Sequence, residues 1–168
     1  MTLSMFEASA PRFAHMLGNL DAILAKAEAY AAAKKIDPAV LLSARLFPDM
    51  FPFVKQVQIA TDHAKGAVAR LAGVEVPRFD DAEHSFEELR ARVAKTIAFV
   101  ESFSPGQIDG SEERQIALKV GGQDMTFKGM PYLLGFAIPN FHFHLVTAYN
   151  ILRHNGLEIG KRDFIGTP

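Results

Sequence analysis

Apolar side chains recur at steps of three and four over four long stretches of the chain, which is the period of an amphipathic helix. These stretches lie within residues 3–35, 49–73, 86–104 and 129–155. In the second stretch the apolar stripe predicts which residues face away from the core, namely Lys55, Gln58, Asp62, Lys65 and Ala69. The pattern therefore predicts four long helices, each with one buried face.

Capping residues and helix breakers predict where the first helices begin and end. Asp37 directly precedes Pro38, which is typical of an N-cap followed by the first helical turn, and predicts a short helix over 39–47. Asp49 is a candidate N-cap for the second long helix, and Gly73 predicts its end.

A change of period separates the third long helix from the fourth. Ser85 and Glu88 have the spacing of a capping box and predict the start of the third helix. Apolar and polar residues then alternate in 114–120 and 124–128, on either side of Gly121-Gly122, which indicates a β-hairpin. We therefore predict an all-α four-helix bundle with short connections and a small hairpin between its third and fourth helices.

Composition narrows the class of protein further. A chain of 168 residues with 49% hydrophobic and 22% charged residues is typical of one soluble globular domain, here 1–168. The 18 basic residues balance 19 acidic ones, which argues against nucleic acid and membrane surfaces as partners. There is no cysteine, no apolar run long enough to span a bilayer and no signal-peptide pattern at Met1, so we expect a cytoplasmic protein.

Without cysteine, the histidines are the main candidates for chemistry. Three of the six have positions that predict a structural role, on the solvent side of the first helix, before a helix cap and in a last helical turn: His15, His84 and His154. His63 lies at the boundary of the apolar stripe, on the same edge of its helix as Gln56. It is either a residue hydrogen-bonded across to another helix, or a metal ligand or general base that points into a cavity.

The fourth helix holds two histidines that cannot share a face. His142 and His144 lie two residues apart, which on a helix separates them by about 200°. The residues that share a face with His144 are Asn140, Thr147 and Ile151. Helical metal sites use histidines at i and i+4, and here the first of these positions is Asn140, whose amide oxygen is a poor ligand for zinc or nickel.

The chain resembles the DinB/YfiT-like superfamily in its order of elements, in the histidine of the second long helix and in the Tyr149-x3-Arg153-x2-Gly156 ending of the last helix. More narrowly it resembles a bacterial branch of that superfamily, a domain of unknown function. The segments that carry this narrower resemblance are FPDMFP at 47–52, QVQIA at 56–60, KGA at 65–67, RLAG at 70–73 and LLGFAIPNF at 133–141.

The resemblance implies an up-down-down-up four-helix bundle that is often a homodimer. It also implies a divalent-metal site of three histidines, one on the second helix and an His-x3-His pair on the last. By position, His63 matches the helix-two ligand and His144 matches the second member of the pair, whereas Asn140 stands in place of the first. The candidates for a substitute third donor are Asp62, Asp49 and, if the helix is broken near it, His142.

Two classes of function follow from the resemblance. Because Asn140 replaces a ligand, we favour a non-catalytic bundle that has lost the full metal site and serves as a ligand-binding or dimeric interaction module. The alternative is an enzyme that uses His63 and His144 to hold a divalent metal and acts as a small-thiol transferase or hydrolase. We expect any zinc or nickel to bind weakly, and a small molecule to be a possible ligand.

The aromatic residues bear on the oligomeric state. Five phenylalanines near the second and fourth long helices are predicted to form core or a dimer surface: Phe51, Phe53, Phe136, Phe141 and Phe143. Since they supply more apolar surface than a thin bundle hides easily, we predict a homodimer. The glycines at 121, 122 and 129 do not follow a buried strand into a helix, so no nucleotide-binding loop is predicted.

Overall fold

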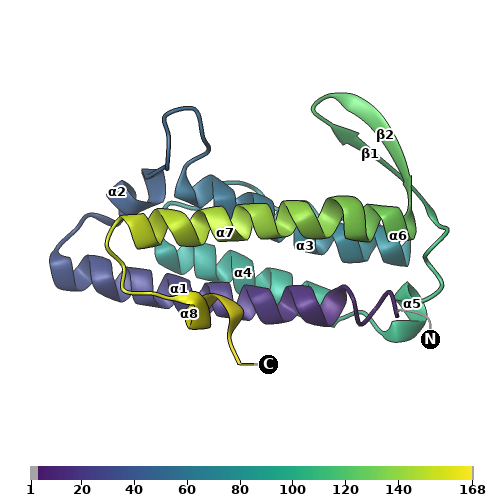
Figure 1. The fold of residues 1–168 in the computed structure, drawn as a ribbon, viewed down its shortest axis with the longest axis horizontal. Coiled ribbons are helices and arrows are strands. Elements are labelled where there is room, and N and C mark those ends of the chain that lie inside the picture. Colours follow the sequence, from purple (N-terminus) through teal and green to yellow (C-terminus); the bar gives the residue numbers. More distant parts are fainter. Residues whose placement is uncertain (1–3, 168) are drawn as a thin grey trace.

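The computed structural model describes residues 4–167, and four long helices lie side by side along its long axis (Figure 1). They are α1 (Ala10–Lys34), α3 (Phe53–Ala72), α4 (Phe86–Glu101) and α7 (Ile138–His154). The shorter elements are α2 (Pro38–Ser43), α5 (Pro105–Ile108), α6 (Gly129–Tyr132), the π-helical turn η1 (Leu133–Ala137) and α8 (Lys161–Ile165). Strands β1 (Gln115–Val120) and β2 (Gln123–Lys128) form an antiparallel hairpin. The predicted helical fold with one hairpin is confirmed.

The long helices run in two pairs of opposite direction. The rings of Phe13 and Phe141 lie 4.9 Å apart between centroids, which brings the starts of α1 and α7 together. At the other end of the molecule the Phe53 and Phe86 rings are 6.2 Å apart, so α3 and α4 also start side by side (Figure 1). Because α3 and α4 are consecutive and parallel, residues 73–85 must return along the length of the helices.

The prediction of an exposed face on α3 is wrong for three of its five residues, which lie on a buried face. Lys65, Gln58 and Ala69 are all buried, with at most 5% of each residue accessible. Gln58 donates a 2.8 Å hydrogen bond to the carboxylate of Glu83, which belongs to the return segment. Hydrophobic periodicity reports only the face that packs on other helices, so it does not detect a face covered by a polar segment.

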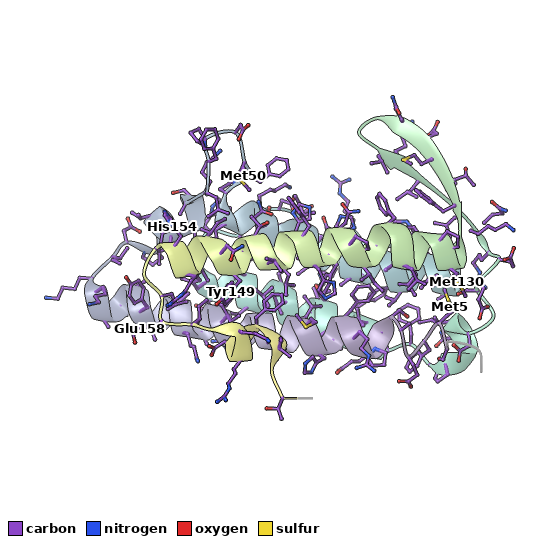
Figure 2. All side chains as sticks on the ribbon, in the orientation of Figure 1. Met5, Met50, Met130, Tyr149, His154 and Glu158 are labelled. Atoms are coloured by element: carbon purple, nitrogen blue, oxygen red, sulfur yellow. The ribbon has the colours of Figure 1, made fainter. Side chains whose placement is uncertain are left out.

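The start of α3 also differs from the prediction. Asp49 is exposed in a loop, residues 44–52, that projects from the helices and also carries Met50 (Figure 2). Pro52 occupies the N-cap position instead, with ψ near 165°. Since a proline disfavours helical geometry at the residue before it, the helix begins only after Pro52. The side chain of Asp37 caps α2 as predicted, but the helix ends at Ser43 rather than at 47, since Ala44 already has extended backbone geometry.

The predicted turns are confirmed. The Ser85 hydroxyl accepts from the Glu88 N–H, although the Glu88 carboxylate reaches back to the N–H of His84 rather than of Ser85. In the hairpin, Gly121 and Gly122 both have positive φ, which a two-residue turn of this kind requires and glycine adopts without strain. No helix within residues 4–167 is long and apolar enough to cross a membrane.

Candidate functional site

A hollow of about 330 Å³ lies where the hairpin meets α3 and the start of α7. We call it the hairpin pocket. Its lining residues are Asp62, His63 and Arg70 from α3, Leu118, Lys119, Val120 and Gly121 from the hairpin, and Phe136 and Asn140 from η1 and α7. The structure thus brings three of the predicted positions, Asp62, His63 and Asn140, to one pocket.

His63 is held in a neutral form. Its ring packs between that of Phe136, 5.9 Å away, and that of His144, 5.8 Å away and nearly parallel. Burial, together with the nearby His144 and Arg70, lowers the pKa of His63 to about 4 although Asp62 acts in the opposite direction. The ring makes no hydrogen bond to another residue of 4–167, so a ligand in the pocket can use its nitrogens.

His144 lies behind His63 and is fixed in one tautomer. Gln56 uses its amide nitrogen to donate to the Phe51 carbonyl at 3.1 Å, which leaves its Oε1 to accept from His144 Nδ1–H at 2.7 Å. The Nε2 atom of His144 is therefore the ring nitrogen with a free lone pair. Burial also lowers the pKa of His144, so both imidazoles are neutral at pH 7.

Asn140 lies one turn before His144, on the face that the sequence predicted. Its amide nitrogen donates to the Phe136 carbonyl at 2.8 Å. His142 is on another side of α7, where Nδ1 bonds to the Ile138 carbonyl and the ring lines a different hollow. Asp49 lies in the projecting loop, and the Asp62 carboxylate is already bonded to the side chains of Arg92 and Lys65, each at 2.9 Å.

The residues present do not fit the three-histidine metal site. Within residues 4–167 no group of three or more histidine, cysteine, aspartate or glutamate side chains could hold a metal ion. The His63 and His144 rings are stacked with 14° between their planes. Because the lone pair of a ring nitrogen lies in the plane of its ring, two stacked rings cannot both point at one ion without rotating.

Comparison with known proteins decides the family. Residues 5–165 match the family "Domain of unknown function (DUF1993)". The chain belongs to DUF1993. A solved structure of a DinB family member protein from Shewanella denitrificans is 42% identical, covers 97% of this chain and 92% of its own, and superposes with a TM-score of 0.88. No curated protein matches the chain. The resemblance to the DinB-like proteins is thereby confirmed.

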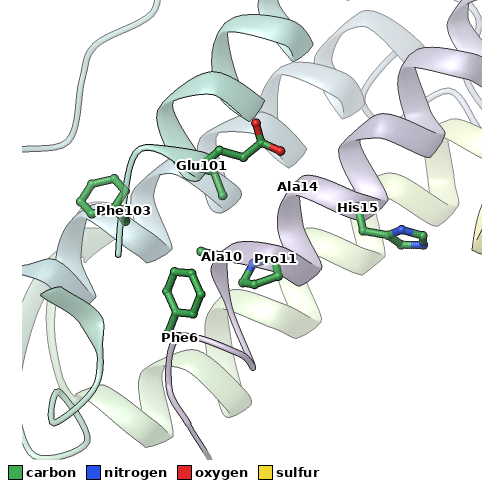
Figure 3. A pocket seen from close by; sticks show the side chains of 8 residues that line it. Phe6, Ala10, Pro11, Ala14, His15, Glu101 and Phe103 are labelled. Carbon is green, nitrogen blue, oxygen red and sulfur yellow. The ribbon is translucent and has the colours of Figure 1, made fainter. Parts of the chain in front are cut away.

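The other histidines of this DUF1993 domain lie outside the hairpin pocket. His15 bonds to the carbonyl of Ile165 at 2.8 Å, and His84 and His154 are exposed, the latter in the last turn of α7 (Figure 2). A third hollow, of about 420 Å³, lies between α1 and the end of α4 (Figure 3). Most of the residues that line it are apolar, and His15 and Glu101 are its titratable residues. Two such side chains do not make a converging set of polar atoms for a ligand.

Sequence reasoning missed Arg70, Lys119 and Phe136 as residues of the DUF1993 pocket. A signal for Arg70 was present, because Gln56, His63 and Arg70 follow one another at intervals of seven, which is two helical turns. The hairpin residues carry no such signal, since their position depends on how the hairpin folds over α3.

Proposed function

We propose that this DUF1993 domain is a ligand-binding protein without the three-histidine metal site of its superfamily, and that a small molecule binds in the hairpin pocket at His63. We also assign its four long helices to the up-down-down-up bundle expected of that superfamily. One observation carries the proposal. The imidazole of His63 is neutral and makes no hydrogen bond within residues 4–167, and Asn140 occupies the position where a metal site needs a further imidazole.

The electrostatics of the pocket support this function. The neutral imidazole of His63 and the amide of Asn140 line the pocket and are hydrogen-bonding groups of moderate strength, suited to orient a polar ligand. None of them supplies the negative charge that helps to hold a divalent cation, and the nearby carboxylate of Asp62 is already paired with two cationic side chains.

A competition titration with a chromogenic chelator tests the missing metal site. We expect zinc and nickel to bind the wild type weakly. The Asn140→His variant creates an His-x3-His pair with His144 on the face toward the pocket, so it should gain at least about tenfold in affinity, or about 1.4 kcal/mol.

Two variants control this titration. Asn140→Gln changes the size of the side chain without adding an imidazole and should bind no better than the wild type. His144→Ala in the Asn140→His background should remove the gain. Tight, stoichiometric metal in the wild type would contradict the proposal, and no gain in Asn140→His would show that position 140 is not a ligand position.

A second candidate function is a divalent-metal enzyme, a small-thiol transferase or hydrolase that uses His63 and His144. One observation favours it: the hydrogen bond from His144 Nδ1–H to Gln56 is the kind of support that metal-binding histidines usually have. The same titration separates the two candidates, because this one requires a metal that stays bound to the wild type.

We further propose that the protein acts as a homodimer. Phe143 is 60% exposed on α7, and Phe51, 55% exposed, lies nearby because its carbonyl and the His144 ring both bond to Gln56. Phe47 on the projecting loop and Val146 on α7 are further exposed apolar residues of the same two segments. A second copy of the chain is the occupant we assign to it, since like surfaces of two copies can cover each other.

A further inference from the structure

Arg70 places an uncompensated positive charge on the wall of the hairpin pocket. The residue is half-buried on α3, and no carboxylate of residues 4–167 forms an ion pair with its guanidinium. The acidic residue of the same pocket, Asp62, has its carboxylate bonded to Arg92 and Lys65 instead. A cation that is partly removed from water and lacks a counter-charge is costly unless an anion joins it.

One neighbour bonds the guanidinium of Arg70 and another leaves the space that it occupies. Its Nη1 donates to the hydroxyl of Tyr132 at 3.1 Å, and Tyr132 is fully buried. One turn earlier on α3 is Gly66, where a Cβ atom would lie only 2.4 Å from that Nη1. The absence of a side chain at Gly66 therefore leaves the space that the guanidinium occupies. The group is positioned before any ligand arrives, which lowers the entropic cost of binding.

The charges around Arg70 indicate a ligand with one negative charge. The one other cation of the pocket lining is Lys119, whose ammonium group is largely exposed on the hairpin and lies 3.7 Å from Asp124. The His63 imidazole is neutral, so among the residues that line the pocket Arg70 alone supplies a cation without an ion pair. A phosphate dianion would remain partly uncompensated there, whereas a carboxylate matches the charge and the planar fork of the guanidinium.

We propose that the ligand of the hairpin pocket is a small monocarboxylate, whose carboxylate is bound by Arg70 and whose apolar body lies against Phe136 beneath the hairpin. This inference rests on the proposed ligand-binding function and names the class of ligand. A volume of about 330 Å³ admits a molecule of the size of a substituted benzoate.

The test uses benzoate, benzamide and phenyl phosphate as probes, and follows the side-chain nitrogen resonances of Arg70 and His63 by NMR. Benzoate should shift both resonances and bind at least about tenfold more tightly than benzamide, its neutral isostere. Arg70→Gln should remove this preference. Arg78→Gln makes the same change of charge at an exposed arginine outside the pocket and should preserve it.

Gly66→Ala tests the position of Arg70 while keeping its charge. Alanine favours a helix more than glycine does, so α3 should persist, but its Cβ would displace the guanidinium. Benzoate affinity should therefore fall severalfold while that of benzamide stays the same. An unchanged benzoate affinity in this variant would overturn the role of Gly66 in the inference.

The outcomes separate this inference from the function on which it rests. If benzoate and benzamide bind equally and Arg70→Gln changes neither affinity, the pocket binds ligands but does not recognise a carboxylate through Arg70. If phenyl phosphate binds more tightly than benzoate, the inference that the ligand carries a single negative charge is wrong. The absence of any shift with benzoate overturns the inference, and if the chelator titration also finds stoichiometric metal in the wild type, the proposed function fails as well.

Discussion

At the residue scale, burial decides the protonation state of His63, and this makes stability depend on pH. The pKa of His63 is about 4 in the folded protein and near 6.5 when the chain is unfolded. Between these values the unfolded state binds more protons, so the free energy of unfolding rises with pH. The stability that depends on a neutral His63 is fully present above about pH 6.5, and it is lost as the pH falls toward 4.

A shift of this size corresponds to about 3 kcal/mol over that interval. We therefore expect denaturant unfolding of the wild type to show a steep loss of stability between about pH 6.5 and 4. His63→Gln, which cannot titrate, should lose markedly less over the same interval. Parallel profiles for the two proteins would contradict the burial described for His63. His144 titrates in the same direction in both and so does not account for the difference.

Single residues also show how far the sequence predicts the site. Helical spacing alone placed Asn140 and His144 on one face, and the boundary position of His63 on its helix followed from the apolar stripe. The heptad spacing with Gln56 and His63 places Arg70 on the same face of its helix, but its importance depends on the absence of a carboxylate partner in the fold. Whether a carboxylate reaches an arginine is a property of the folded arrangement, which residue types and spacing do not give.

At the scale of elements, the four long helices and the hairpin were predictable because each shows its own period and carries its own turn or capping residues. The course of the return segment 73–85 along the helices was not, since its polar residues give no periodic signal. Much of its attachment is made by Arg92 of α4, whose side chain is 2% exposed and bonds to Asp81 and Glu83 of the segment and to Asp62 of α3. Arg92 of α4 thus acts together with Gln58 and Lys55 of α3 to hold the connecting segment along the surface of two parallel helices.

We expect Arg92→Met to destabilise the protein by about 3 kcal/mol, because it removes one partner and leaves several carboxylates with less compensation. The free energy of unfolding from urea titration measures this effect. Arg90→Met is the matched control, since Arg90 lies on the same helix and its ion pair with Asp21 is partly exposed. A loss no larger in Arg92→Met than in Arg90→Met would show that the network does not hold the segment.

At the scale of the whole molecule, the apolar area around Phe143 predicts self-association. Sedimentation velocity at micromolar concentration should show a dimer for the wild type. A double variant, Phe47→Ser with Phe143→Ser, should shift the protein to monomer, because both side chains are more than half exposed in the single chain. Val74→Ser, at an exposed apolar residue near the end of α3, should leave the dimer intact. A monomeric wild type would contradict the prediction.

The hairpin gives the pocket a wall that can open without the rest of the fold. Only two strands compose it, and a lone two-stranded sheet is marginally stable in water unless it packs on a neighbour. Ile116 is its buried anchor, whereas most of β2 is exposed. Local opening of such an element costs less free energy than global unfolding. Amide hydrogen exchange in β1 and β2 therefore measures the local opening of the hairpin over the pocket. A bound ligand should slow that exchange more than it slows exchange in α1.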